Sequence, residues 1–227
     1  EGLRLAEELR LWPEVAGRLG WLGWIAMMRR AYPQAREYSE RALRLATEQG
    51  HQSAQVLAEI GLGFTALREG DLETADTHLR TLLKAVPEGT DAAPPMHLSL
   101  VQVGLGHVAE RRGDPATALA FHRDALTISV RYHGPRDGAF ALEGLAGALS
   151  LAGHHGQAAR LLGAAAAARR SSGLPPGPVE LDDIDRVTAR IRAVLPEDDF
   201  AAEFDHGGTL SPADCLRDIE RVRLEPT

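Results

Sequence analysis

Several features that would point to particular functions are scarce or missing in this chain of 227 residues. There is one cysteine, Cys215, so no internal disulfide bond can form, which fits a reducing compartment. No uncharged apolar stretch approaches the roughly 20 residues that a helix needs to span a bilayer. We therefore expect a cytoplasmic protein without a membrane segment.

Positive charge is also scarce. The chain carries 32 acidic and 25 basic residues, which gives a net charge of −7. Residues 1–177 contain 19 of each sign, whereas residues 178–227 contain 13 acidic and 6 basic residues, so the C-terminal part supplies the whole excess. A surface that binds nucleic acid needs a basic face to replace phosphate counterions. The sequence predicts no direct nucleic-acid partner.

Motifs for catalysis or metal binding are missing as well. Two Gly-x-Gly tripeptides, at residues 61–63 and 104–106, lack the preceding strand and the third glycine of a dinucleotide-binding loop, and we interpret them as helix-packing glycines. The nine histidines include no His-x-x-x-His pair and no cysteine cluster supports them, so we expect solvated or capping histidines. We predict no catalytic residue, no metal site, no cofactor and no enzymatic activity.

A repeat is the main feature that the chain does contain. A leucine followed by a small residue recurs at spacings of 40, 43 and 40 residues, at Leu22-Gly23, Leu62-Gly63, Leu105-Gly106 and Leu145-Ala146. An alanine follows each small residue after twelve positions, at Ala35, Ala75, Ala118 and Ala158. A turn residue lies between the two landmarks, at Arg30, Gly70, Gly113 and Gly153. Two helices approach within about 8–10 Å only where side chains are small, so each repeat predicts a helix–turn–helix hairpin.

This pattern resembles the tetratricopeptide repeat, whose signature is Leu-Gly in the first helix, an alanine twelve residues later and a second alanine seven residues further on. The second alanine is present as Ala42, Ala125 and Ala165, with Leu82 in its place in the second unit. The resemblance implies an all-α fold, a right-handed α-α superhelix of helical hairpins. We expect repeat units at about residues 12–50, 51–93, 94–134 and 135–173, preceded by a partial helix at 1–11 from a further repeat upstream.

Residues 174–227 are expected to form an acidic C-terminal helical cap. Residues 171–178 hold three prolines and two glycines, which stop a helix and turn the chain. A helix with an apolar side from Val179 to Leu195 should follow, and then a short helix with Phe200 and Phe204 spaced i, i+4. The last helix should begin at Ser211, with serine as N-cap and Pro212 in the first helical position.

The stretch from Leu161-Leu162-Gly163-Ala164-Ala165 through the Pro-Pro turn to Phe200, Phe204 and Thr209-Leu210-Ser211 is more specific. Over about residues 141–220 it resembles the C-terminal end of bacterial, actinobacterial-type transcriptional regulators that join a STAND-type ATPase to a helical-repeat sensor. These include LuxR-like regulators and the Streptomyces antibiotic regulatory protein type. The resemblance implies transcription regulation with ATP-driven switching. Both activities would belong to other domains, because this chain has no phosphate-binding loop and no recognisable DNA-binding helix-turn-helix motif.

In a tetratricopeptide superhelix the first helix of each hairpin lines a concave groove, and this groove is the candidate binding site. Its predicted lining comprises Trp24, Met27, Met28, Phe64, Leu67, Arg68, His107, Glu110, Arg111 and Glu143. Apolar anchors beside a few polar groups are typical of a peptide or small-molecule site, and methionine adapts to varied shapes. The alternative is that the apolar residues pack between helices and the charged ones are solvated.

The function predicted from the sequence is a non-catalytic helical-repeat sensor or protein-interaction module of a bacterial transcriptional regulator. Its groove would hold a protein or peptide partner, its own upstream ATPase domain, or a small-molecule effector. Trp12, Trp21 and Trp24 near the N-terminus make a homodimer a further expectation, since exposed apolar patches mediate self-association. A stand-alone tetratricopeptide scaffold or adaptor is the alternative.

Overall fold

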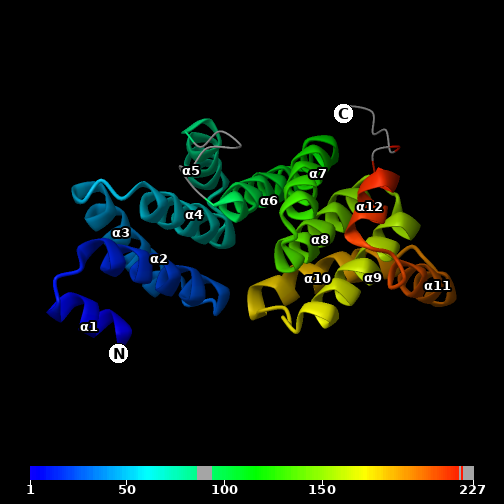
Figure 1. Cartoon of the computed structure of the whole chain (residues 1–227). Helices are drawn as coiled ribbons and strands as arrows, with labels where there is room; N and C mark the ends of the chain where they lie inside the picture. Colours follow the sequence, from blue (N-terminus) through cyan, green and yellow to red (C-terminus); the bar gives the residue numbers. More distant parts are fainter. Residues whose placement is uncertain (86–93, 220, 222–227) are drawn as a thin grey trace. The chain divides into compact units, whose positions relative to one another are not determined.

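The computed structural model describes residues 1–85, 94–219 and 221. Within these residues the chain forms α-helices and no β-strand (Figure 1). The helices are α1 (Gly2–Glu8), α2 (Trp12–Met28), α3 (Tyr32–Glu48), α4 (Gln52–Glu69), α5 (Leu72–Ala85), α6 (Pro95–Arg111), α7 (Pro115–Tyr132), α8 (Pro135–Leu151), α9 (His155–Ser172), α10 (Pro178–Arg192), α11 (Glu197–Gly207) and α12 (Pro212–Ile219). The predicted all-α class is confirmed.

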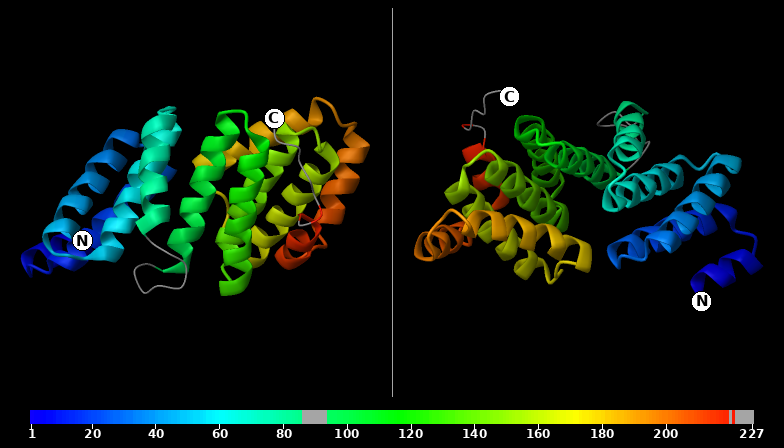
Figure 2. Two further views of the ribbon diagram at one scale, coloured as in Figure 1. Left: turned by 90° about the horizontal axis from the view of Figure 1, so that it is seen from above. Right: turned by 180° about the vertical axis from the view of Figure 1, so that it is seen from behind.

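Two compact units divide the chain, and the boundary falls inside α6. The N-terminal unit is Glu1–Gly104 and the C-terminal unit is Leu105–Thr227. In the N-terminal unit, α2 packs against α3 and α4, and α4 packs against α3 and α5, so neighbouring helices form antiparallel pairs (Figure 2). In the C-terminal unit, α8 packs against α7 and α9, α10 packs against α8 and α9, and α11 packs against α9. The predicted boundaries of the four repeat units and of the cap stay predictions.

Small residues close the hairpins, as the repeat pattern predicts. A Cβ atom added at Gly23 would lie 3.2 Å from the backbone oxygen of Ala35, and one added at Gly63 would lie 3.0 Å from Cγ of Leu79. Ala35 and Ala75 are fully buried. Because the helices of each pair touch almost at the backbone here, a larger side chain at either alanine would overpack the seam.

The turns between paired helices adopt left-handed backbone conformations at the predicted positions. The φ angles of Gly70, Gly113 and Gly153 are 87°, 78° and 85°, and Arg30 takes the same role with φ 63°. Glycine populates this region freely, whereas a residue with a Cβ atom loses roughly 1–2 kcal/mol there. Arg30 therefore keeps the turn geometry of the repeat at an energetic disadvantage.

The C-terminal helices follow the expected order with one difference. Ser211 and Asp214 cap α12 reciprocally: the Asp214 amide donates to Oγ of Ser211 (3.2 Å), and the Ser211 amide donates to Oδ2 of Asp214 (3.0 Å). The helix expected to extend to Leu195 ends earlier, at Arg192, and Val194 is 66% exposed. The apolar pattern predicted too long a helix because it included Val194, which lies in the turn before α11 and not on the buried side of α10.

Helices α9 and α11 cross at two glycines. A Cβ atom added at Gly163 would overlap the backbone oxygen of Phe204, and one added at Gly207 would overlap the backbone oxygen of Arg160. Each glycine thus admits the backbone of the other helix. The crossing fixes α11 on α9, and Phe200 and Phe204 stack with ring centroids 5.8 Å apart.

Candidate functional site

The apolar groove candidates of the N-terminal unit lie in its interior. Trp24, Met27, Met28, Phe64 and Leu67 are all buried. The rings of Trp24 and Phe64 meet edge-on, with centroids 5.2 Å apart and an interplanar angle of 74°, a favoured aromatic arrangement. A ligand could touch these side chains only after others moved, so their role in binding stays a prediction.

The charged and histidine candidates separate into two groups. His107, Glu110 and Glu143 are buried in the C-terminal unit, with 4%, 5% and 7% of their surface exposed. Arg111, the last residue of α6, is exposed, and Arg68 near the end of α4 is partly exposed. The structure therefore places His107, Glu110 and Glu143 in the interior of the C-terminal unit and Arg111 on its surface, whereas Arg68 belongs to the N-terminal unit.

Helix α10 covers the face of α6 and α8 on which Glu110 and Glu143 lie. Nη1 of Arg186 donates to Oε1 of Glu110 (2.6 Å). Nη1 of Arg190 donates to Oγ of Ser150 (3.0 Å). In a buried setting such charge-assisted hydrogen bonds are stronger than neutral ones. The predicted groove face in this unit is thus occupied by a helix of the same chain.

A second set of contacts joins α9 to the start of α10. Arg169 holds Glu143 with two hydrogen bonds, from Nε to Oε1 (2.6 Å) and from Nη2 to Oε2 (2.7 Å). Nη2 of Arg169 also lies 3.2 Å from Oε1 of Glu180, whose other oxygen accepts a hydrogen bond from the Gly177 amide (2.6 Å). Glu180 thereby caps the first turn of α10 and ties it to α9 at once.

We use the name ionic cluster for the charged groups that α10 shares with α6, α8 and α9. Its members are Glu110, Glu143, Arg169, Glu180, Asp183, Arg186 and Arg190. Burial raises the pKa of Glu143 to about 7, against the opposing effect of Arg169, and the charges of Glu180 and Asp183 add to the shift. Burial opposes ionisation of Glu110 too, but contacts with His107 and Arg186 outweigh it and hold the pKa of Glu110 well below its usual range.

A cavity of about 470 Å³ lies beside the ionic cluster. Its lining comes from Glu143 of α8, from α9, from the Pro175-Pro176 turn, from α10 and from Phe204 of α11. We call it the α9–α11 pocket. Its apolar walls are Leu162, Ala166, Pro175, Pro176, Leu181, Ile184 and Phe204, and its polar groups include Glu143, Arg169, Arg170 and Thr188. The volume lies in the range of small-molecule sites, roughly 300–1,000 Å³.

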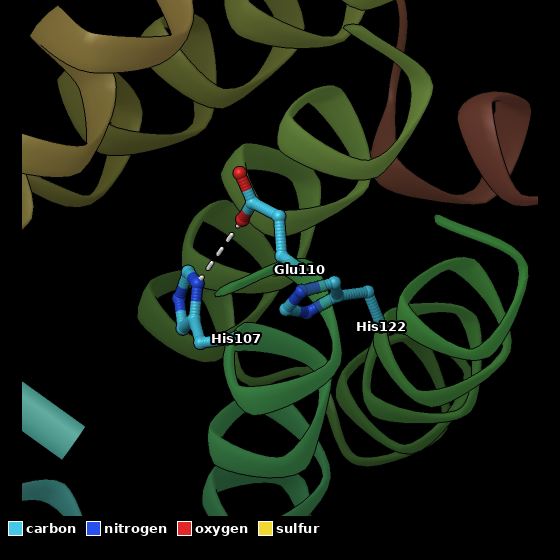
Figure 3. Close-up of side chains that lie close together, drawn as sticks. All are labelled: His107, Glu110 and His122. Atoms are coloured by element: carbon cyan, nitrogen blue, oxygen red, sulfur yellow. Dashed lines mark ion pairs between the residues drawn. The ribbon is translucent and has the colours of Figure 1, made fainter. Parts of the chain in front are cut away.

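Three side chains in the C-terminal unit have the donor types of a metal site. We call them the histidine cluster: His107, Glu110 and His122 (Figure 3). Each side chain offers one ligand atom, and these atoms lie within 4.8 Å of one another. The expectation of solvated or capping histidines is wrong for His97, His107 and His122, which are 4%, 4% and 0% exposed. His107 and Glu110 are three residues apart on α6, so only contact with α7 completes the set.

A comparison of the repeats with one another could have found His122. It follows Ala118 by four residues, and the same position holds Ser39, Leu79 and Leu162 in the other hairpins. Ser39, Leu79 and Leu162 are all buried. An imidazole at a position that elsewhere faces the helix seam is therefore expected to be buried too.

The helices, their small-residue seams and their left-handed turns define an all-α protein built of helical hairpins. Residues 98–171 match the model of the tetratricopeptide repeat family, so this part of the chain is a tetratricopeptide-like repeat region. Repeats of this kind generally mediate protein–protein interaction, and their fold is typically non-enzymatic. No curated protein sequence matches the chain. Among the described helices, none combines the length and apolar character of a membrane span.

Proposed function

We propose that this chain is the sensor and protein-interaction region of a bacterial transcriptional regulator, and that the α9–α11 pocket takes a small effector. The pocket is the observation that carries the effector assignment, because it has the volume of a small-molecule site and is lined by Glu143 and Arg169, which hold α10. The effector site thereby lies next to the predicted groove face rather than on it.

The lining indicates the chemistry of the effector. Most of the wall is aliphatic, aromatic or proline surface, which favours an apolar molecule. Arg169 already has two carboxylate partners, Glu143 and Glu180, whereas the side chain of Arg170 is largely exposed at the pocket. We infer an apolar molecule with one anionic group that pairs with Arg170.

Binding in the pocket can change the attachment of α10. Arg169 and Glu143 line the pocket and belong to the ionic cluster, so an occupant contacts the groups that connect α8 and α9 with α10. A ligand shifts such an equilibrium only if it binds the docked and the released state of α10 with different affinity. A partner protein would then bind the face of α6 and α8 that α10 covers.

The pocket can be tested with a matched pair of probes, decanoate and 1-decanol, which share a chain length and differ in charge. Isothermal titration calorimetry on the full chain should show tighter binding of decanoate. Arg170→Gln should remove that preference and leave 1-decanol binding unchanged, whereas Arg123→Gln on the exposed surface of α7 should change neither. Equal binding of both probes to the wild-type chain, or an unchanged preference in Arg170→Gln, would contradict the anionic assignment.

The regulator context rests on the resemblance of residues 141–220 to the C-terminal ends of STAND-type regulators. The bacterial, actinobacterial-type origin, the cytoplasmic location and an interaction with an ATPase domain are parts of the same proposal. The complete open reading frame is its test. A phosphate-binding loop and a DNA-binding domain in the same polypeptide support the regulator, and their absence favours the stand-alone scaffold.

A further inference from the structure

The histidine cluster presents an unusual concentration of unsatisfied polar atoms in the core. Oε2 of Glu110, Nε2 of His107, and both ring nitrogens of His122 are buried and have no hydrogen-bond partner within the described residues. Each such atom destabilises a fold, because it loses its hydrogen bonds to water without gaining others. Neither the repeat fold nor the proposed effector site accounts for all of them in one place.

The positions of these atoms suit a shared ligand. Nδ1 of His107 lies 3.6 Å from Oε2 of Glu110, and the rings of His107 and His122 meet edge-on with centroids 5.0 Å apart. Figure 3 shows the carboxyl group of Glu110 directed toward His107, with the ring of His122 reaching the same region from α7. Zinc ligands lie about 2.0–2.2 Å from the metal in a tetrahedral site. Tetrahedral ligands at this distance lie about 3.4 Å apart, so the donor atoms, which are within 4.8 Å of one another, would close by at most about 1.4 Å.

Glycines of the two neighbouring helices leave space for the ring of His122. Cβ atoms added at Gly106 of α6 or Gly144 of α8 would overlap its imidazole ring. In the other hairpins the same register position carries serine or leucine, at Ser39, Leu79 and Leu162. Glycines also flank this position in two other hairpins, where Gly23 and Gly61 contact Ser39 and Gly63 and Gly104 contact Leu79. The space therefore belongs to the repeat, and the feature particular to this hairpin is a buried side chain with two ring nitrogens.

The surroundings of Glu110 also match metal ligation. Arg186 and Arg190 approach Glu110 through Oε1, and Oε2 stays directed to the histidines. Nη2 of Arg186 also lies 3.2 Å from Oδ1 of Asp183, so a second carboxylate balances the positive charge of this arginine. The arginines therefore orient the carboxylate as the outer shell of a metal site does.

We infer that His107, Glu110 and His122 form a binding site for one divalent transition-metal ion of the zinc class, which links α6 to α7 beneath α10. Two imidazoles and one carboxylate are a frequent zinc donor set, and a fourth position is left for water. The role is structural, because the site is closed to solvent and α10 covers it. Since binding to such a site couples to folding, uptake is slow in the folded protein and rapid during refolding.

The experiment uses the full chain without an affinity tag, unfolded, freed of metal with a chelator and refolded with or without Zn²⁺. The bound zinc is counted by elemental analysis after gel filtration, and Co²⁺ replaces Zn²⁺ for absorption spectroscopy. We expect one zinc per chain, a higher unfolding temperature with Zn²⁺ than with Mg²⁺, and a cobalt spectrum typical of tetrahedral ligands. No bound zinc after refolding, or an unchanged unfolding temperature, would overturn the assignment. The buried polar atoms of the histidine cluster would then be hydrogen-bonded to buried water or have no partner.

Two variants locate the metal. His122→Leu carries the residue found at the same position in two other hairpins, so it should fold, and it should lose the bound zinc or bind it at least about tenfold more weakly. His154→Gln removes an exposed histidine instead and should keep one zinc per chain. If His122→Leu retains full zinc, the metal is elsewhere and the inference is wrong. His107→Gln serves as a second ligand variant, and its cobalt spectrum should be altered or lost.

Discussion

The crossing of α9 and α11 makes the sharpest test of the packing, through the substitution Gly163→Ala. The added Cβ atom would be about 1 Å closer to the backbone oxygen of Phe204 than the 3.0 Å limit that real Cβ atoms respect. The obstacle is backbone, so α11 must move or α9 must bend. Overpacking of this kind destabilises a fold by about 1–3 kcal/mol.

The same substitution has an opposing benefit, which a control can isolate. Alanine in a helix interior is more favourable than glycine by about 0.5–1 kcal/mol. Gly17 in α2 has no atom within 4 Å of the position its Cβ would take, so Gly17→Ala should give that benefit alone. Gly163→Ala should therefore give a net loss of up to about 2.5 kcal/mol relative to the wild-type chain. For a chain of this size each kcal/mol shifts the unfolding temperature by roughly 2–4 °C.

Thermal unfolding followed by circular dichroism compares the two variants with the wild-type chain. The expected order of unfolding temperatures is Gly17→Ala, then wild type, then Gly163→Ala. Phe204 also lines the α9–α11 pocket, so Gly163→Ala should weaken decanoate binding while Gly17→Ala leaves it unchanged. A Gly163→Ala protein as stable as Gly17→Ala would refute the close backbone crossing.

Three further predictions concern ionisable groups. A hydrogen bond to Glu59 raises the pKa of His78 in the folded protein. The stabilisation of the fold by this pair is therefore complete below the unfolded pKa near 6.5 and is lost as pH rises through the pKa of the folded state. In chemical denaturation, His78→Gln should lower the free energy of unfolding by about 0.5–1 kcal/mol at pH 5.5 and by little at pH 9. Burial, together with nearby acidic side chains, raises the pKa of the Cys215 thiol to about 11. A thiol reagent at pH 8 should therefore react with Cys215 at full rate only in denaturant. Rapid labelling of the native protein would contradict the buried position of this thiol. Arg169→Met leaves Glu143 buried without its bidentate partner and should cost about 3–5 kcal/mol in urea unfolding, whereas a loss below about 1 kcal/mol would mean that the pair is solvated.

The sequence predicted the fold well because the repeat depends on local spacing. Gly23 and Ala35 face each other because they are equally distant from a turn, and Arg30 occupies the left-handed position that the aligned glycines indicated. The contacts of α10 could not be predicted in this way. Arg186 and Glu110 are 76 residues apart, and no periodic pattern specifies which buried carboxylate a distant arginine meets.

The candidate sites were predictable only in part. Glu110 and Glu143 were expected on a groove face, and they do lie together in the interior, but the helix that covers them was expected only to end the repeat array. The α9–α11 pocket depends on the path of the Pro175-Pro176 turn, which sets the gap between two helices. Proline content shows that a turn exists, but not how far apart it leaves the helices that it joins.

Because α10 is joined to α9 by only five residues, 173–177, any partner of the α6 and α8 face competes with a tethered segment of the same polypeptide. A connection this short gives such a segment a high effective concentration at the face that it covers. The apparent affinity of a partner is then its intrinsic affinity reduced by the fraction of molecules in which the face is exposed. Shortening or lengthening this connection would tune partner recruitment without altering a single residue of the recognised surface.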